Sequence, residues 1–521
     1  MAALVLLQEV VPLQDPSKGW RANYGFWIRL AILGGAPVAG MAAFIKFMIP
    51  GVAISLRQLA LISTGQAILY PMVGMAVAEL WVFPIPFIVL SLIGLYVAIF
   101  AGLFRVVVGR QAIGHMATHK DELILLMSFI SSQAGMAVTY AGFEVLFDAA
   151  TDTNFELPVL LLLPLIKVVM KNIVSRCIVH MKDMVPEAVI FTVDFFNSMY
   201  LATCMQNSSS PTTLAAMMVI DFTQTAVSLH SLHHHTDTIL SRLHHACDDA
   251  AGDGSLLPAV SSLCRDTSKF EQQCRAGIVL HSCIPHKVSG EGRKLLETLK
   301  AIPGNGIPTL PHFHTPRLRE FGASFRLLEH TRAASSPSSP KSMWPCASRS
   351  VTKVKPIPDP ENVARTAERS RTSGLRTGQH RKLLAETLEV LFTSECLILT
   401  EYLESVIPIL YGSFILLVVH LPSAQYHIDL VGVTRDNVGE TIGSVFIYAL
   451  LELISFVTLA VLMLRNCRVH ALYHLAFVLE TQMLLVQVKL TTWVLMAFSF
   501  RVVHFGKLSR NPGQYLSFVL G

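Results

Sequence analysis

The stretch LILTEYLESVIPILYGSFILLVVHL, residues 397–421, decides the class of this protein. Its only Asp, Glu, Lys or Arg residues are Glu401 and Glu404, both in its first third. A helix needs about 20 mainly apolar residues to cross the hydrocarbon core of a bilayer. This stretch is therefore predicted to be a membrane-spanning helix.

Comparable apolar runs fill two blocks of the chain, residues 27–232 and 397–503. Apolar residues make up 52% of the sequence and charged residues 15%, whereas soluble domains carry about 25% charged residues. A soluble protein of this composition would expose large apolar patches to water, which soluble monomers rarely do. The expected fold is an all-α polytopic membrane protein with about 10–11 transmembrane helices and a long, largely disordered cytosolic loop.

The chain divides into a membrane block of about seven helices (1–234), a basic Pro/Ser-rich loop (235–385) and a second block of three or four helices (386–521). The final apolar stretch, 471–504, is too long for one simple crossing, and it fits either two short helices or one long helix. The spans expected before it are 25–47, 58–80, 82–104, 123–147, 157–178, 187–205, 212–232, 397–421 and 441–464.

Basic residues in short loops favour the cytosolic side of a membrane. They occur in alternate connections, whereas the connection at 148–156 carries only acidic charge. This pattern predicts an outside N-terminus and a cytosolic central loop, in the plasma membrane or an endomembrane. The basic residues concerned are Lys46, Arg57, Arg105, Arg110, Lys120, Arg176 and Lys182.

The central loop holds most of the positive charge. Residues 287–382 contain 18 Lys+Arg against 7 Asp+Glu. Amphipathic pieces at 292–302 and 318–329 suit an anionic membrane face, or they are solvated loop helices. The loop lacks interleaved aromatic residues and any nucleic-acid-binding module, so we expect no nucleic acid. The expected partners are the lipid bilayer and, through the loop, anionic lipid or cytosolic proteins.

Polar residues within the spans are the candidate functional residues, because charged groups in a membrane are costly and usually face a bundle interior or an aqueous path. Three pairs of these residues lie at i, i+3 spacing and so share a helix face: Asp194 with Asn197, Asp221 with Gln224, and Glu401 with Glu404. Pro408 removes the helical hydrogen bond to the Glu404 carbonyl. Structural ion pairs, an ion or proton path, and acid/base catalysis remain alternatives. The candidates are Asp194, Asn197, Asp221, Gln224, Glu401, Glu404, Glu452 and Glu480, with Arg29, Lys167, Lys171, Lys489 and Arg501 as possible basic partners.

A histidine cluster follows the seventh expected span. His230 and His234 lie one helical turn apart and are weak candidates for a transition-metal site. A polar helix end at the membrane surface explains the cluster as well. The sequence has no H-E-x-x-H, P-loop, Rossmann or G-x-S-x-G motif, so we expect no catalytic residues, cofactor or resident metal, and no enzyme.

Several long motifs resemble a functionally uncharacterised family of multi-pass transmembrane proteins from oomycetes such as Phytophthora. They are VDFFNSMYLATCMQ (193–206), LTEYLESVIPILY (399–411), HLPS (420–423), ALYHLAFVLETQ (471–482) and VHFG (503–506). The resemblance covers both membrane blocks and implies a shared membrane core, without supplying an activity. The motifs contain Asp194, Asn197, Glu401, Glu404 and Glu480.

These patterns favour a transporter or channel-like protein whose carboxylates line a polar path. The alternative is a membrane receptor or scaffold whose cytosolic loop binds partners or anionic lipid.

Overall fold

The computed structural model describes residues 2–49, 52, 54–150, 153, 155–177, 189–208, 211–246, 256, 290–291, 293–294, 360–481 and 483–505. Within these ranges the regular structure is helical, and the only extended pairing is an isolated bridge between His427 and Val502. The all-α fold expected from the sequence is confirmed for this part of the chain.

The first block contains α1 (Ala2–Val10), η1 (Pro16–Lys18), α2 (Tyr24–Gly35), α3 (Pro37–Met48), α4 (Leu56–Leu80), α5 (Ile88–Ser91), α6 (Ile93–Val107), α7 (Arg110–Thr118), α8 (Lys120–Ala150), α9 (Glu156–Leu160), α10 (Leu162–Cys177), the π-helical turn η3 (Ile190–Asp194), α12 (Phe195–Asn207) and α13 (Pro211–Ala246). The second contains α17 (Pro360–Val418), η5 (Pro422–Tyr426), η6 (Ile428–Leu430), α18 (Val438–Thr441), α19 (Gly443–Cys467), α20 (Ala471–Thr481) and α21 (Met483–Phe500).

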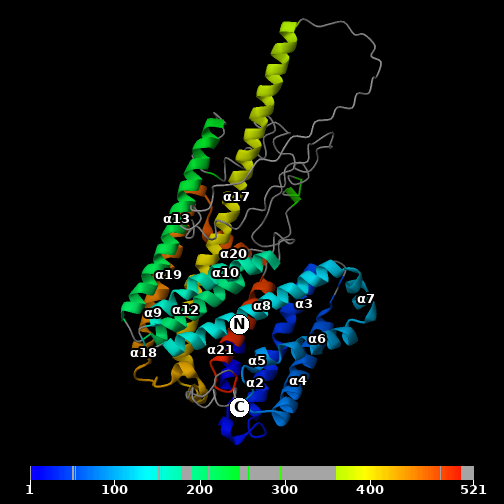
Figure 1. Cartoon of the computed structure of the whole chain (residues 1–521), viewed down its shortest axis with the longest axis vertical. Coiled ribbons are helices and arrows are strands. Elements are labelled where there is room, and N and C mark those ends of the chain that lie inside the picture. Colours follow the sequence, from blue (N-terminus) through cyan, green and yellow to red (C-terminus); the bar gives the residue numbers. More distant parts are fainter. Residues whose placement is uncertain are drawn as a thin grey trace, which may run out of the picture.

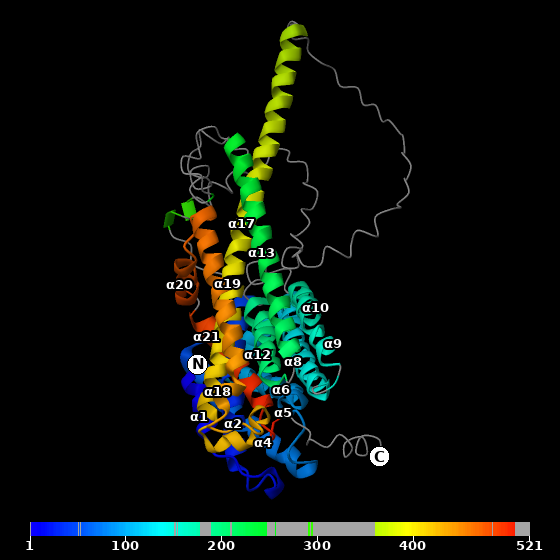
Figure 2. The ribbon, with the colours of Figure 1, turned by 90° about the vertical axis from the view of Figure 1, so that its left-hand side faces the viewer.

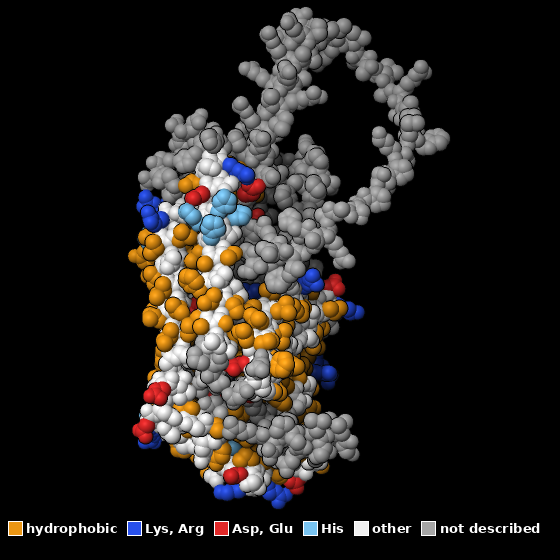
Figure 3. All heavy atoms as spheres, turned by 60° about the vertical axis from the view of Figure 1, so that its left-hand side comes forward, with side chains coloured by type: hydrophobic (Ala, Val, Ile, Leu, Met, Phe, Trp, Pro, Cys, Tyr) orange, Lys and Arg blue, Asp and Glu red, His pale blue; other side chains and the backbone are white. Residues whose placement is uncertain are grey.

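In the described part of the chain, seven helical segments are long and apolar enough to cross a membrane. A face of the molecule carries a wide band of hydrophobic side chains, with charged residues toward its two ends and a patch of histidines near one of them (Figure 3). The seven segments are Tyr24–Ala42, Leu56–Leu80, Leu123–Ala150, Glu156–Cys177, Thr212–Arg242, Leu383–Val418 and Gly443–Cys467, and shorter apolar helices occur at Ile93–Val107, Ala471–Glu480 and Val486–Phe500. This arrangement supports the membrane class expected from composition.

The helices pack as two neighbouring groups (Figures 1 and 2). In one group α4 packs between α2 and α6, and in the other α17 packs on α12, α13 and α19. Helix α21 lies between the groups, because it contacts α2 and α3 on one side and η3 on the other. The late chain segment thus holds the two parts of the first block together.

The expected sixth span, 187–205, is the central helix of the second group. Residues 189–206 of η3 and α12 are all buried. Helix α12 is covered by α8, α10, α17 and α19. A helix enclosed on all sides offers its polar groups to other helices, and this position makes η3 the centre of the site described below.

In the final apolar stretch, left open between one helix and two, the described residues on either side of residue 482 are helical and form α20 and α21. Helix α20 packs on α17 and α19, whereas α21 lies between the two groups.

Two helices extend past the expected loop boundaries at residues 234 and 386. Helix α13 continues to Ala246, α17 begins at Pro360, and both project at the same end of the molecule (Figure 1). Apart from residue 256 and short pieces at 290–291 and 293–294, the loop between these two helices lies outside the described residues, including the amphipathic piece at 318–329.

Candidate functional site: a buried carboxylate cluster

The centre of the second helix group is acidic. Asp194 ends η3, Asp221 lies on α13, Glu401 and Glu404 lie on α17, and Glu452 lies on α19. Asp194 has no exposed surface, and the three glutamates are 2–6% exposed. Asp221 is partly buried. Residues from four separate parts of the sequence are therefore gathered in one place.

Two lysines of α10 reach this centre. Lys167 and Lys171 lie one turn apart and share a helix face. Lys171 Nζ is 2.7 Å from Asp194 Oδ1, and Lys167 Nζ is 3.7 Å from the same oxygen and 2.5 Å from Glu404 Oε1. Thr400 of α17 also donates a 3.4 Å hydrogen bond to Asp194 Oδ2. Both lysines are therefore used to neutralise Asp194 and Glu404.

Glu401, Glu404 and Glu452 form a tight group. Their carboxylate oxygens can be chosen so that all lie within 4.8 Å of one another. Glu401 Oε2 and Glu452 Oε2 are buried and have no hydrogen-bond partner among the described residues. Oxygen ligands at this spacing match the preferences of hard cations such as Ca²⁺, Mg²⁺ and Mn²⁺.

Asp221 extends the cluster from α13. Its carboxyl is a hydrogen-bonding neighbour of Glu452, and its Oδ2 accepts a 3.4 Å hydrogen bond from the Tyr448 hydroxyl. Two ionised carboxylates have no donor between them, so the contact between Asp221 and Glu452 requires a proton or a cation.

Helix α17 lacks one backbone hydrogen bond next to Glu404. Pro408 has no N–H to donate to the Glu404 carbonyl oxygen, and the Ser198 hydroxyl of α12 donates to that oxygen at 3.4 Å. The interruption expected from the sequence is thus compensated by a neighbouring helix, in the manner typical of membrane helices. It places Ser198 and Glu404 at the contact between α12 and α17.

The cluster has more acids than bases. Among the residues that the structure describes, five carboxyl groups face two lysines. An uncompensated charge in a low-dielectric interior costs several kcal/mol. The remaining negative charge must therefore be neutralised by protons or by a bound cation.

Two other buried ionic networks do not have an excess of acidic groups. In the first, Arg29 of α2 bonds Glu9 of α1 at 2.9 Å, and His427 Nε2 lies 2.9 Å from the same Glu9 oxygen. In the second, Arg501 pairs with Asp429 and donates to Thr203 at 2.5 Å. Each network has as many basic as acidic groups or more, which is the pattern of a structural contact.

Sequence reasoning missed most of the second network. Asp429 lies in the connection after α17, outside every expected span, and its partner Arg501 follows α21. Gln206 donates to the Asp429 carbonyl at 2.7 Å, and the Tyr411 hydroxyl donates to Gln206 Oε1 at 2.7 Å. No local spacing in the sequence signals these contacts.

Three other candidates differ from one another in burial. Asn197 is buried on α12, and its Oδ1 has no hydrogen-bond partner among the described residues. Gln224 is partly buried on α13. Glu480 is exposed near the end of α20.

The histidine candidates lie on α13, just before its projecting end. His230 and His234 are both exposed, and a patch of histidines is visible near this end of the molecule (Figure 3). The neighbouring His233 contacts Asp237 at 3.4 Å and Asn466 at 2.6 Å. In the described residues, metal-type ligand spacing is found at Glu401, Glu404 and Glu452 and not at the histidines.

Comparison of the chain with protein-family models, with curated proteins and with solved structures returns no match.

Proposed function

We propose that this chain is a non-enzymatic, integral multi-pass membrane protein that moves a cation across the membrane, as a transporter or channel-like protein. The cation is a proton or a hard metal ion, and it binds at Glu401, Glu404 and Glu452. The observation that carries the proposal is the excess of buried carboxyl groups over lysines, which only a positively charged ligand or protons can offset.

The cluster is closed to solvent, which corresponds to an occluded site. The carboxylates of Glu401, Glu404 and Glu452 are buried, and the apolar cavity in the first helix group is lined by other residues. Movement of a cation would require α17 or α19 to shift relative to α12 and α13, so that the site opens first to one side and then to the other. The missing backbone hydrogen bond at Pro408 of α17 is a suitable place for such a shift.

In this proposal the membrane contains the seven long apolar segments, together with the shorter helices that complete about 10–11 crossings. The N-terminus lies outside and the loop between α13 and α17 lies in the cytosol. The resemblance to the oomycete family is compatible with this picture, because its motifs include Asp194, Glu401 and Glu404.

The experiment uses the purified full chain in liposomes. Proton entry is followed with a trapped pH-sensitive dye, and Ca²⁺ or Mn²⁺ entry with a trapped metal indicator, under an imposed gradient. We expect flux of one of these cations, and a loss of about tenfold or more in Glu452→Gln and Glu401→Gln, because each change removes one acidic ligand.

Glu440→Gln is the matched control, since Glu440 is an exposed acid of α18. Correct folding of each variant is verified by its thermal unfolding profile. The proposal is overturned if folded Glu452→Gln and Glu401→Gln carry the same flux as the wild type, or if no cation gradient produces flux.

A further inference from the structure

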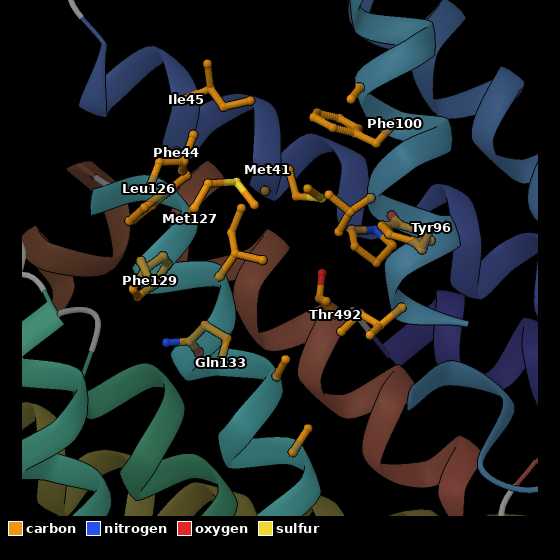
Figure 4. A pocket seen from close by; sticks show the side chains of 18 of the residues that line it. Met41, Phe44, Ile45, Tyr96, Phe100, Leu126, Met127, Phe129, Gln133 and Thr492 are labelled. Atoms are coloured by element: carbon orange, nitrogen blue, oxygen red, sulfur yellow. The ribbon is translucent and has the colours of Figure 1, made fainter. Parts of the chain in front are cut away.

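A large apolar cavity lies in the first helix group and its contact with α21. Its volume is about 430 Å³, and its walls come mainly from α3, α6, α8 and α21. Figure 4 shows Met41 and Ile45 of α3, Phe100 of α6 and Met127 of α8 around the space. Ligand pockets measure roughly 300–1,000 Å³, and an engineered apolar cavity of about 150 Å³ already binds benzene.

The cavity wall also contains unsatisfied polar groups. Gln133 of α8 is 8% exposed, and neither its amide nitrogen nor its amide oxygen has a hydrogen-bond partner among the described residues. The buried indole N–H of Trp493 on α21 also has no hydrogen-bond partner among the described residues. Native structures satisfy most buried polar groups, so three such atoms on one cavity indicate an occupant with a polar group of its own.

The polar side chains at the cavity come from one face of α8 and one face of α21. Phe129 and Gln133 lie one turn apart on α8, and Lys489 and Trp493 lie one turn apart on α21. The ammonium of Lys489 lies 5.9 Å from the centre of the Phe129 ring, which brings the two helices together at this level. Gln133 and Thr492 lie at the end of the cavity away from Ile45 and Phe100 (Figure 4). The cavity thus has an apolar body and a polar end.

The cavity is separated from the carboxylate cluster by aromatic rings. Trp493 packs edge-to-face on Phe196 at 5.1 Å, and Phe196 stacks on Tyr140 at 5.6 Å. The Tyr140 hydroxyl is 3.5 Å from the Val193 carbonyl in η3. An occupant would therefore lie behind the wall that supports Asp194, without contacting the acids.

We propose that the cavity binds a single-chain lipid amphiphile with a carboxylate headgroup, such as a long-chain fatty acid. The alkyl chain fills the space between α3, α6 and α8. The carboxylate accepts hydrogen bonds from Gln133 Nε2 and Trp493 Nε1, beside the positive charge of Lys489. One ligand thereby fills an apolar void and satisfies the buried donors that line it.

The test measures binding of radiolabelled hexadecanoate to the delipidated full chain in detergent, with 1-hexadecanol and hexadecane as competitors. We expect saturable binding of one hexadecanoate per chain, displaced less effectively by the alcohol and least by the hydrocarbon. Gln133→Leu should weaken hexadecanoate binding by about tenfold, the effect of losing one hydrogen bond to a charged group, and leave the effect of hexadecane unchanged.

Ala137→Phe tests the apolar part of the site. Ala137 is 3% exposed and lines the cavity, so a phenyl ring there would occupy the space and abolish binding of all three compounds. Val138→Phe is the matched control, because the adjacent Val138 is 55% exposed. If folded Gln133→Leu and Ala137→Phe bind hexadecanoate as the wild type does, the compound only partitions into the micelle and the proposal is wrong. Equal affinity for hexadecane and hexadecanoate would also exclude the headgroup site.

Discussion

At the scale of single residues, the ion pair of Lys171 with Asp194 shows how the centre of the molecule is balanced. Asp194 has no exposed surface, so its charge depends on Lys171 at 2.7 Å and Lys167 at 3.7 Å. Removing one partner of a buried pair leaves the other charge uncompensated, and that loss exceeds the net value of the pair itself.

Lys171→Met should therefore lower the free energy of unfolding by about 3–5 kcal/mol. Chemical denaturation of the detergent-solubilised protein measures the change. Adding Asp194→Asn to Lys171→Met should restore part of the loss, because the orphaned charge is removed as well. Lys120→Met is the control, since Lys120 is exposed at the start of α8. A single variant as stable as the wild type would show that Asp194 does not depend on Lys171.

The buried carboxyl group of Glu9 makes the stability of the fold depend on pH. Burial alone raises the pKa of Glu9, but the hydrogen bond and charge of His427 and the charge of Arg29 outweigh burial and lower it. A group with a lowered folded-state pKa stabilises the fold fully above its ordinary value of 4.5, and that stabilisation is lost as the pH falls through the folded-state pKa.

The unfolding free energy of the wild type should thus fall as the pH drops below 4.5, and part of this fall should be absent in Glu9→Gln. Denaturation curves taken across this range give the comparison. The same slope in both proteins would mean that Glu9 does not contribute to the acid sensitivity.

Five carboxylates that the structure gathers were recognisable in the sequence, because each interrupts an apolar run. The same rule selected Glu480, which is exposed, since an apolar run does not show which face of its helix turns inward. The role of Tyr448 was not recognised, although it lies one turn before Glu452 on α19. Its contact with Asp221 of α13 depends on how the two helices pack.

At the scale of helices, the contact of α2 with the N-terminal segment depends on a glycine. A Cβ atom on Gly25 would overlap the carbonyl oxygen of Pro12, which belongs to a neighbouring backbone segment. The segment between α1 and α2 begins with Val11, whose carbonyl accepts a hydrogen bond from Arg29, the partner of Glu9, so the docking of this segment and the Glu9 network are coupled.

Gly25→Ala should therefore destabilise the protein by about 1–3 kcal/mol through overpacking. Thermal unfolding measures the loss. Gly94→Ala is a closely matched control, because Gly94 also lies in the first turn of its helix and a Cβ there meets nothing within 4 Å. Equal stability of the two variants would show that Pro12 can move away without cost.

The apolar runs of the sequence predict where helices lie more accurately than they predict where helices end. The expected spans 58–80 and 441–464 correspond to α4 and α19 within three residues at each end. The span expected from residue 82 has no regular helix before Ile88, since Pro84 and Pro86 lack the N–H groups that a helix uses. Helices α13 and α17 continue beyond the expected loop boundaries because their projecting ends are polar and carry no apolar period.

At the scale of the whole molecule, the distribution of basic loops predicts the orientation. An epitope inserted after residue 340 should be accessible to antibody only in permeabilised cells, whereas an N-terminal epitope should be accessible in intact cells. If the protein resides in an internal membrane, selective permeabilisation of the plasma membrane exposes the loop epitope first. Detection of the loop epitope on the outer or lumenal side would reverse the proposed topology.

Helix α17 has a mechanical consequence for the molecule. Its 59 residues make a rod about 90 Å long, which is about three times the thickness of a bilayer core. Pro408 lies close to one end of this rod, so a tilt of about 5° there displaces the Pro360 end by about 6 Å, roughly one helical turn. Glu404 is one turn from that pivot. A change in charge at the buried Glu404 that tilts α17 by a few degrees would thus produce a much larger movement where the central loop joins this helix.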